Sequence, residues 1–186
     1  MPHTAAILVP VSRLGPPIRA ANALQLFLNF GFLSERRGIY LRTSLTRILL
    51  VEDFKPYRSL TATLLSHNPN LKVIGEAEDG SEAVAQAQQL KPDLILMDIG
   101  LPKLNGLEAA RRIRDVLPSA KIVFLTQVAD VDVVKVAFNL GARGYIVKQQ
   151  AETELLTAIA AVLSGKQFVT SGLSGDGFGV QKSTKD

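Results

Sequence analysis

Acidic side chains directly follow two short apolar segments of this 186-residue chain. Glu52 and Asp53 come after residues 47–51, and Asp98 comes after residues 94–97. If both segments are parallel strands of one sheet, their carboxyl ends meet at one edge and bring the three carboxylates together. Carboxylates without a cationic neighbour repel one another, and an all-oxygen site that keeps several waters is typical of Mg²⁺. The pattern therefore predicts a magnesium site.

Two further polar side chains follow strand-like segments. Thr126 comes after residues 121–125, and Lys148 comes after residues 144–147. A lysine ammonium can hold an anion, and a hydroxyl can donate a hydrogen bond to it. Together with a metal ion they would bind a phosphoryl group, for which Asp98 is the nearest nucleophile. Because phosphoryl transfer needs mainly positioning and charge neutralisation, these groups suffice for an acyl phosphate to form on Asp98.

Each of these residues also has a structural explanation when it is taken alone. An aspartate at a strand end, such as Asp98, is most often a turn or cap residue, and a Glu-Asp pair complements the dipole at a helix start. Lys148 on its own fits a solvated loop, and Thr126 on its own fits the end of a strand. The functional interpretation rests on their joint occurrence at four strand ends.

The segments between these residues alternate between strand and helix patterns. Strands are predicted at residues 47–51, 71–77, 94–97, 121–125 and 144–147. Helices are predicted from Pro56, with Leu60, Leu64 and Leu65 on the apolar face, and over residues 81–90, 107–116, 131–140 after an Asp130 cap, and 152–163. Five such units imply a single α/β domain with a doubly wound, five-stranded parallel sheet and helices on both faces.

The composition excludes several classes of protein. With 47% apolar residues and no cysteine, the chain is neither wholly disordered nor held by disulfides, and it has no thiolate chemistry. The two histidines, His3 and His67, are too far apart in sequence to suggest a metal site or a catalytic triad. No apolar run reaches the roughly 18 residues of a membrane-spanning helix. We therefore expect a cytoplasmic protein without a membrane partner.

Charge is distributed unevenly along the chain. The net charge of +4 resides in residues 1–44, whereas the basic and acidic residues of the remainder balance. A nucleic-acid-binding surface needs several lysines and arginines gathered on one face, so we expect no direct contact with nucleic acid. Residues 1–44 lack a periodic pattern and are predicted to be a disordered N-terminal extension. A start codon chosen too far upstream would explain such an extension. The alternatives are a transit peptide, which fits the scarcity of acidic residues, and a secretory signal, whose basic pair Arg36 and Arg37 would lie on the wrong side of the apolar stretch.

Four sequence motifs resemble those of the receiver domain of two-component response regulators. They are ILLVED over residues 48–53, DLILMDIGLPKLNG over 93–106, IVFLT over 122–126 and GARGYIVK over 141–148. Their order and spacing both fit, and the resemblance extends over about two thirds of the chain. It implies a flavodoxin-like sheet with the strand order 2-1-3-4-5 and a receiver domain at residues 45–165.

The resemblance implies a role for each residue at the strand ends. Asp98 corresponds to the phosphoacceptor, and Lys148 corresponds to the lysine that pairs with the phosphoryl group. The implied Mg²⁺ ligands are Glu52, Asp53, Asp98 and the main-chain carbonyl of Gly100, and the implied switch residues are Thr126 and Tyr145. Receivers take the phosphoryl group from a histidine kinase or a phosphotransfer protein. They signal to a downstream protein, or by self-dimerisation, through a face that corresponds here to residues 130–140, 144–147 and 152–163.

Two positions depart from the family pattern. Gln127 follows the switch threonine where the family usually has a small residue, and we expect it to narrow access to the phosphoryl group. Gln149 follows Lys148 where many members have proline. Neither change removes a required group, so we expect phosphorylation with altered kinetics. Tyr145 is expected to pack against the last helix in one state and to turn inward when Thr126 moves toward a phosphoryl group.

The end of the resembling region is most similar to receivers of the NarL type, which normally continue into a DNA-binding helix-turn-helix domain. Only about 20 residues follow the last predicted helix, against the roughly 60 that an output domain with its own core would need. We therefore expect residues 166–186 to be a tail without an output domain. The protein would then be a stand-alone, non-enzymatic receiver in a phosphorelay.

Three alternatives stay open from the sequence. A degenerate receiver would bind a partner without phosphorylation, and a remnant of a transcription regulator would have lost its output domain. A flavodoxin-like nucleotide or flavin protein would share the topology. It would need a glycine-rich or hydroxyl-rich phosphate loop after the first strand, where this chain has Glu52 and Asp53.

Overall fold

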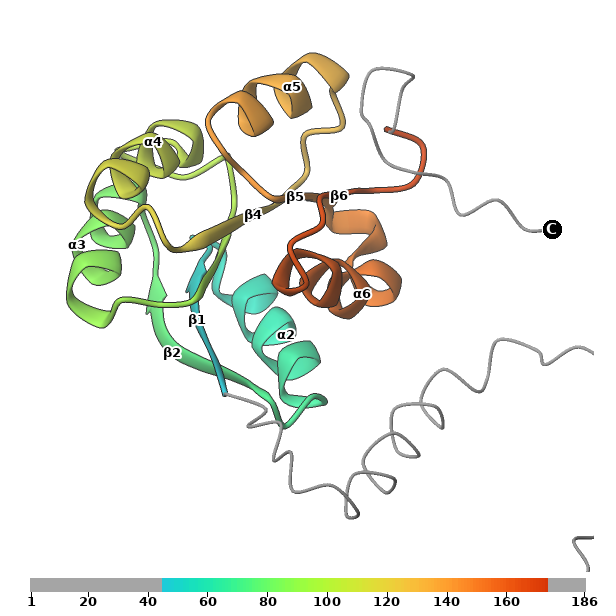
Figure 1. Ribbon diagram of the computed structural model, residues 1–186, viewed down its shortest axis with the longest axis horizontal. Coiled ribbons are helices and arrows are strands. Elements are labelled where there is room, and N and C mark those ends of the chain that lie inside the picture. The colour runs from blue at the N-terminus through green and yellow to red at the C-terminus, as the bar shows by residue number, and fades with distance from the viewer. Residues whose placement is uncertain (1–44, 174–186) are drawn as a thin grey trace, which may run out of the picture. The chain divides into compact units, whose positions relative to one another are not determined.

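The computed structural model describes residues 45–173, which alternate between strands and helices (Figure 1). The strands are β1 (Thr46–Val51), β2 (Leu71–Ala77), β3 (Leu94–Met97), β4 (Lys121–Thr126), β5 (Gly144–Val147) and β6 (Phe168–Val169). The helices are α2 (Lys55–Ser66), α3 (Gly80–Leu90), α4 (Gly106–Val116), α5 (Val131–Asn139), the short 3₁₀ helix η2 (Lys148–Gln150) and α6 (Ala151–Leu163). Every predicted strand and helix is present, with bounds that differ only slightly from the predicted ones.

The strands form one parallel sheet in the order β2-β1-β3-β4-β5-β6. The order of the first five strands confirms the predicted doubly wound, flavodoxin-like fold. β6 is an addition that the sequence pattern does not predict, because two residues after a turn give no periodicity to recognise. It pairs with β5 in the register Gly144↔Phe168 and Tyr145↔Val169, so residues that follow the predicted domain end join the sheet.

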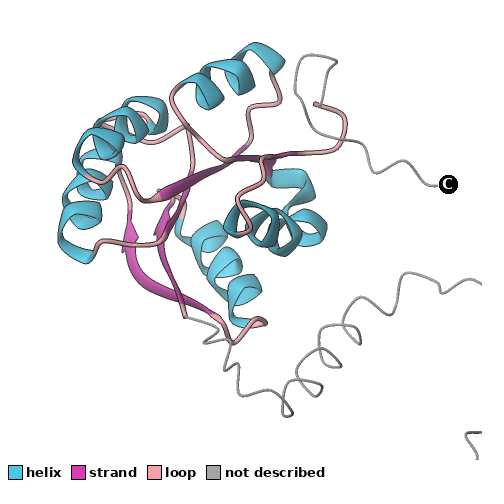
Figure 2. Cartoon of the chain, in the orientation of Figure 1, coloured by secondary structure: helices cyan, strands magenta, loops and turns pink. Residues whose placement is uncertain are grey.

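Helices cover both faces of the sheet (Figures 1 and 2). Because side chains alternate along a strand, Ile48 and Leu50 of β1 belong to one core, whereas Leu49 and Val51 belong to the other. The first core lies beneath α2 and α6, and the second lies beneath α3, α4 and α5. β3 and β5 are buried along their whole length and β4 is buried except at Lys121, whereas the edge strand β2 is partly exposed.

The buried face of α2 differs from the predicted one. Leu65 is buried as expected, but Leu60 is 43% exposed, and the residues that face the sheet include Arg58 and Thr61. The prediction used only the leucines to choose the apolar face. The side that is buried carries Arg58, Thr61 and Leu65, which are spaced as residues on one face of a helix are. The helix therefore buries an arginine near its start, next to the end of β1.

Side-chain caps begin three of the helices. Asp79 caps α3, Asn105 caps α4 and Asp130 caps α5, each with an oxygen that accepts main-chain N–H groups of the first turn. The predicted role of Asp130 is thereby confirmed. α4 begins at Gly106, where an added Cβ would lie 2.0 Å from the main-chain oxygen of Asp98. Glycine is required here because the helix starts directly against this strand end.

Two predicted segments lie outside the described residues. They are the N-terminal extension, 1–44, and residues 174–186 of the predicted tail. In the part of the chain that the structure describes, no helix has the length and apolar character needed to cross a bilayer.

Candidate functional site

Three carboxylates meet at the carboxyl edge of the sheet. Glu52 and Asp53 follow β1, and Asp98 follows β3, which is the neighbouring strand. Each residue offers a carboxylate oxygen, and these oxygens lie within 4.8 Å of one another, as the strand-end pattern predicts. Glu52 and Asp98 are buried, whereas Asp53 is exposed. Oxygen groups spaced in this way, with one open side, fit a hard divalent cation that keeps part of its water shell.

The ammonium of Lys148 lies between Glu52 and Asp98. Its Nζ atom is 2.6 Å from Oε2 of Glu52 and 2.7 Å from Oδ2 of Asp98, and the side chain is only 8% exposed. The carboxylates therefore have a cationic neighbour of their own, whereas the strand-end pattern predicted Lys148 only as a partner of a bound anion. One ammonium beside three carboxylates leaves an excess of two negative charges, and a divalent cation would balance this excess.

Tyr57 of α2 contacts Lys148 in two ways. Nζ of Lys148 lies 4.6 Å from the centre of the Tyr57 ring, a distance at which the ring face attracts a cation. The Tyr57 hydroxyl, whose pKa burial raises to about 12, donates a hydrogen bond to the Lys148 carbonyl at 3.4 Å. Burial by itself lowers the pKa of Lys148, but its hydrogen bonds to Asp98 and Glu52 outweigh this effect and raise the pKa. The lysine is therefore held in its charged form.

Glu52 is the most deeply buried of the three carboxyl groups. Burial raises its pKa, although the hydrogen bond from Lys148 acts in the opposite direction. The negative charge of Asp98 raises the pKa further, and the main-chain N–H of Phe54, which donates to Oε1 at 3.3 Å, lowers it. The ionised form of Glu52 is thus costly in this setting, and a bound cation would favour it.

Both carboxylate oxygens of Asp98 have a partner. The Gly100 N–H donates to Oδ1 at 3.1 Å, and Lys148 contacts Oδ2. The Asp98 N–H donates to the Val51 carbonyl at 3.0 Å, which continues the β1–β3 ladder to the strand ends. Gly100, whose carbonyl the resemblance implies as a metal ligand, lies on the loop beside this carboxylate. The orientation of Asp98 is therefore fixed from the main chain and from Lys148.

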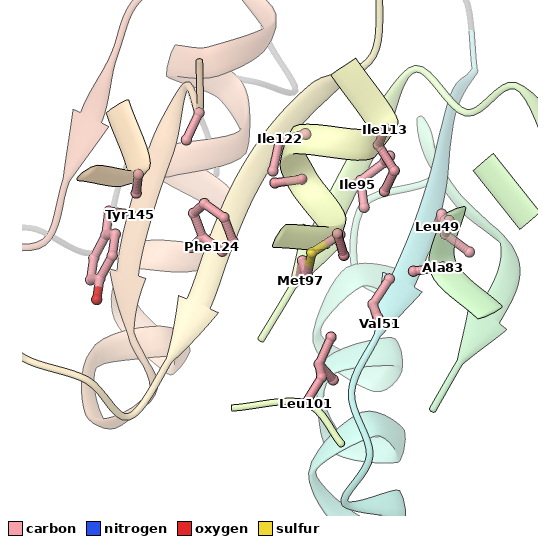
Figure 3. Close-up of a cluster of buried hydrophobic side chains, with 14 of the residues drawn as sticks. Leu49, Val51, Ala83, Ile95, Met97, Leu101, Ile113, Ile122, Phe124 and Tyr145 are labelled. Carbon is pink, nitrogen blue, oxygen red and sulfur yellow. The ribbon is translucent and has the colours of Figure 1, made fainter. Parts of the chain in front are cut away.

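Thr126 and Tyr145, the predicted switch residues, both bond to Val128. The Val128 N–H donates to the Thr126 hydroxyl oxygen at 3.4 Å, and the Tyr145 hydroxyl donates to the Val128 carbonyl at 2.8 Å. The Tyr145 ring is fully buried and lies near Phe124, with 6.3 Å between ring centres (Figure 3). It belongs to the core beneath α3, α4 and α5, so the expectation that it packs against α6 is wrong for this state.

Two residues of α2 contact the site but are absent from the sequence analysis. Tyr57 lies against Lys148, and Arg58 donates hydrogen bonds to the main-chain carbonyls of the acidic pair. A signal for Arg58 was available, because it falls on one helical face with Thr61 and Leu65 and a charged residue on a buried face is uncommon. No comparable signal marked Tyr57.

Residues 48–160 match the Response regulator receiver domain family. The chain belongs to this family. Among curated relatives of the receiver, the transcriptional regulatory protein LiaR of Bacillus subtilis is 38% identical over 129 residues, 69% of this chain and 61% of LiaR. The nitrate/nitrite response regulator protein NarL of Escherichia coli K12 is 33% identical over 127 residues, 68% of this chain and 59% of NarL. The receiver chain thus spans less than two thirds of the length of these relatives.

Solved receiver structures share the fold. A two-component response regulator of the LuxR family from Aurantimonas sp. SI85-9A1 has a TM-score of 0.68 and 34% identity, over 70% of this chain and 93% of that one. The response regulator domain of Thermotoga maritima CheB has a TM-score of 0.61 and 30% identity, over 64% of this chain and 97% of that one. Phosphorylation and Mg²⁺ binding are standard for receivers, and this chain has an acidic group formed by Glu52, Asp53 and Asp98.

Proposed function

We propose that this receiver accepts a phosphoryl group on Asp98 in a two-component phosphorelay, with Mg²⁺ held by Glu52, Asp53, Asp98 and the carbonyl of Gly100. One observation carries the proposal. The Lys148 ammonium lies 2.7 Å from Asp98 beside a group of carboxylate oxygens that are within 4.8 Å of one another. A nucleophile, a cation for the phosphoryl oxygens and a metal-binding oxygen group are thereby close together.

The transfer would be a single displacement at phosphorus. A carboxylate oxygen of Asp98 attacks a phosphohistidine, so that a P–O bond forms, the P–N bond breaks, and the histidine leaves as neutral imidazole with a proton from solvent. Lys148 would pair with one phosphoryl oxygen, and the Thr126 hydroxyl would donate to another. Bound Mg²⁺ would supply further neutralisation of the phosphoryl charge. Because the chain itself carries the product, we predict a signal carrier and not an enzyme.

Phosphorylation of the full chain by acetyl phosphate, with Mg²⁺ or with EDTA, tests this proposal. Intact mass should reveal one phosphoryl adduct that requires Mg²⁺ and is lost in Asp98→Asn. Asp93→Asn is the matched control, because Asp93 is an exposed aspartate at the opposite end of β3. Its Oδ2 atom accepts the Arg47 N–H at 2.8 Å, which an asparagine oxygen can also do. This control should retain the adduct.

An unmodified but folded protein would contradict the proposal. It would favour the degenerate receiver, which binds a partner without phosphorylation. An adduct that persists in Asp98→Asn would contradict the assignment of the phosphoacceptor alone. Far-ultraviolet circular dichroism of each variant would separate these outcomes from a failure to fold.

We further propose that the face formed by α5, β5 and α6 contacts the downstream protein or a second copy of the chain. Val136 on α5 is 46% exposed and Leu156 on α6 is 39% exposed. Each of the two helices of this face therefore offers an apolar side chain that a partner could cover. Val136→Asp should therefore weaken phosphorylation-dependent association, measured as the molecular mass in solution with and without acetyl phosphate. An unchanged association would contradict this choice of surface.

We expect Gln127 to lengthen the lifetime of the phosphoryl group on Asp98 by restricting the approach to it. It is exposed and directly follows Thr126, which is 1% exposed. We expect Gln127→Ala to open the approach to Asp98 and to accelerate both adduct formation and adduct loss, measured as a time course of intact mass. Unaltered rates would indicate that the glutamine side chain points away from the approach.

The named relatives are longer than this chain and are regulatory proteins, so their activity is not carried over to it as a finding. What the whole protein does is therefore also a proposal. We predict that the receiver itself makes no direct contact with nucleic acid, and that it lies in the cytoplasm beside a histidine kinase or phosphotransfer protein. A binding assay of the phosphorylated chain with double-stranded DNA at low salt would contradict the first prediction if it detected a complex.

A further inference from the structure

Arg58 is a buried cation with four hydrogen-bond acceptors around its guanidinium. Nε donates to Oε2 of Glu76 at 2.9 Å, and Nη2 donates to Oε1 of Glu78 at 2.6 Å. Nη1 donates to the main-chain carbonyl of Glu52 at 2.6 Å and more weakly to that of Asp53 at 3.5 Å. The residue is 6% exposed. A planar group with five donors can hold such a set of side-chain and main-chain acceptors at once.

The charge of Arg58 is balanced by two carboxylates that are not part of the acidic group of the site. Glu76 lies on β2 and Glu78 lies in the loop after it, and their side chains are 50% and 65% exposed. A buried cation without a partner is costly, and these two carboxylates supply its partners. The guanidinium therefore contacts the carbonyl oxygens of Glu52 and Asp53, while the Glu52 carboxylate bonds to Lys148.

Arg58 stabilises the turn that carries the acidic pair, through hydrogen bonds to the main chain of that turn. α2 begins at Lys55, directly after Glu52, Asp53 and Phe54. The Arg58 N–H donates to the Phe54 carbonyl at 3.0 Å, and its side chain reaches back to the two preceding carbonyls. Main chain and side chain of one residue thus bind three consecutive carbonyls, so the turn is held from the helix.

We infer that Arg58 is a positioning residue for the Mg²⁺ site, which fixes the main chain of Glu52 and Asp53 so that their carboxylates lie beside Asp98. The inference rests on the proposed function, since it concerns the same metal. Arg58 donates to no carboxylate of the acidic group, so its effect on the metal is exerted through the backbone of the ligands.

Removal of Arg58 should therefore weaken Mg²⁺ binding in a folded protein. Groups that orient metal ligands typically change metal affinity by about 10–100-fold when they are replaced. We expect a rise of about this size in the Mg²⁺ dissociation constant of Arg58→Gln. Arg58→Lys keeps the charge but not the planar fork, so it should restore part of the affinity.

Arg47 provides a matched control at the opposite end of β1. Its guanidinium also donates to two main-chain carbonyls, those of Lys91 at 2.9 Å and Leu90 at 2.6 Å. It is exposed and lies at the start of the strand, whereas the acidic pair follows the strand end. Arg47→Gln should lower stability by loosening the end of α3 and leave the Mg²⁺ dissociation constant unchanged.

Isothermal titration of Mg²⁺ into the EDTA-dialysed full chain is the deciding experiment, with circular dichroism as the measure of folding. Wild type, Arg58→Gln, Arg58→Lys and Arg47→Gln are compared at one temperature. Glu78→Gln is added because it removes an exposed partner of Arg58 that is not one of the three carboxylates of the acidic group, and it keeps the test valid if Arg58→Gln does not fold. It should weaken Mg²⁺ binding by severalfold, since the guanidinium loses a partner that orients it.

The outcomes distinguish this inference from the proposed function. Tight binding to wild type and Arg47→Gln, with weaker binding to Arg58→Gln and Glu78→Gln, would support the inference. Wild-type affinity in the folded Arg58 or Glu78 variants would overturn it and leave the proposed function intact. Absence of Mg²⁺ binding to wild type would overturn both. A loss of affinity in Arg47→Gln equal to that in Arg58→Gln would indicate a general effect of stability, and would overturn the inference as well.

Discussion

The hydroxyl oxygen of Thr170 accepts a hydrogen bond from the Val147 N–H at 2.9 Å. Thr170 is 1% exposed and directly follows β6, and its own N–H donates to the Tyr145 carbonyl at 2.9 Å. These two bonds extend the pairing of β5 and β6 to the residue before Lys148. The segment after α6 therefore supports the strand end that carries the lysine of the site.

Replacing Thr170 by valine should destabilise the domain. Thr170→Val retains the side-chain shape but removes the acceptor, so the buried Val147 N–H loses its partner. An unsatisfied buried donor costs about 1–3 kcal/mol of the free energy of unfolding. Thr153→Val is the control, because the Thr153 hydroxyl donates to the Gln150 carbonyl at 3.1 Å in an exposed setting. Urea unfolding should give a loss of about 0.5 kcal/mol or less for the control, and equal losses would contradict this role of Thr170.

The raised pKa of Glu52 makes a prediction about stability and pH. Below the usual glutamate pKa of 4.5, Glu52 is protonated in the folded and the unfolded chain. As the pH rises above this value, the folded state retains the proton longer, so stability falls until the pH has passed through the raised pKa. Glu52→Gln lacks this titration. In EDTA, the variant should gain stability relative to wild type as the pH rises through this window, and then keep a constant difference.

Mg²⁺ should reverse this trend in wild type, because a bound cation favours the ionised carboxylate. Urea unfolding at several pH values, with EDTA and with Mg²⁺, measures both effects. A difference between wild type and Glu52→Gln that does not change with pH would contradict the raised pKa. Equal stabilisation of both proteins by Mg²⁺ would contradict a role of the Glu52 carboxylate in metal binding.

The Tyr145 hydroxyl should contribute measurably to the stability of this state. Tyr145→Phe removes the hydrogen bond to the Val128 carbonyl at 2.8 Å and leaves the buried ring in its core. The expected loss in the free energy of unfolding is about 1 kcal/mol, the typical net value of one hydrogen bond. Tyr57→Phe loses a longer bond, at 3.4 Å, and should lose less. A larger loss in Tyr57→Phe would contradict this ranking by bond geometry.

Most of the site could be predicted because strand ends are readable in a sequence. The apolar runs of β1, β3, β4 and β5 stop abruptly at polar residues, and parallel strands bring these ends to one edge. The pattern thus predicts Glu52, Asp53 and Asp98 together without any knowledge of the loops. The contact of Lys148 with both Glu52 and Asp98 was less accessible, because it depends on the path of a long, flexible side chain.

The rest depends on helix rotation and on pairing between distant segments. Whether Tyr57 and Arg58 face the site or the solvent is decided by a rotation of α2 that its leucines did not specify, since Leu60 is exposed. β6 pairs with β5 through only two residues, and the pairing is supported by Thr170 beyond it. Alternation along β5 places Tyr145 on the face of the sheet opposite to Ile146, but the sequence pattern does not show which of the two faces α6 covers.

Gly106 should prove indispensable for the geometry of the phosphoacceptor. An added Cβ would lie 2.0 Å from the Asp98 main-chain oxygen and 2.9 Å from the Cα of Ile99. Main-chain atoms cannot yield as a side-chain tip does, so Gly106→Ala must push α4 away from the end of β3. We expect a loss in the free energy of unfolding of about 1–3 kcal/mol or more, as for other overpacked sites, together with weaker phosphorylation of Asp98.

Gly100→Ala is the comparison for stability, because its new Cβ would meet nothing closer than the Asp98 carboxylate oxygens at 3.9 and 4.0 Å. Urea unfolding should therefore give a markedly smaller loss for Gly100→Ala than for Gly106→Ala. Equal losses would contradict the contact between α4 and the strand end as the cause, because the reduced entropy of the unfolded chain favours both alanine variants alike. A stable Gly106→Ala protein that is still phosphorylated at the wild-type rate would show that α4 can shift without moving Asp98.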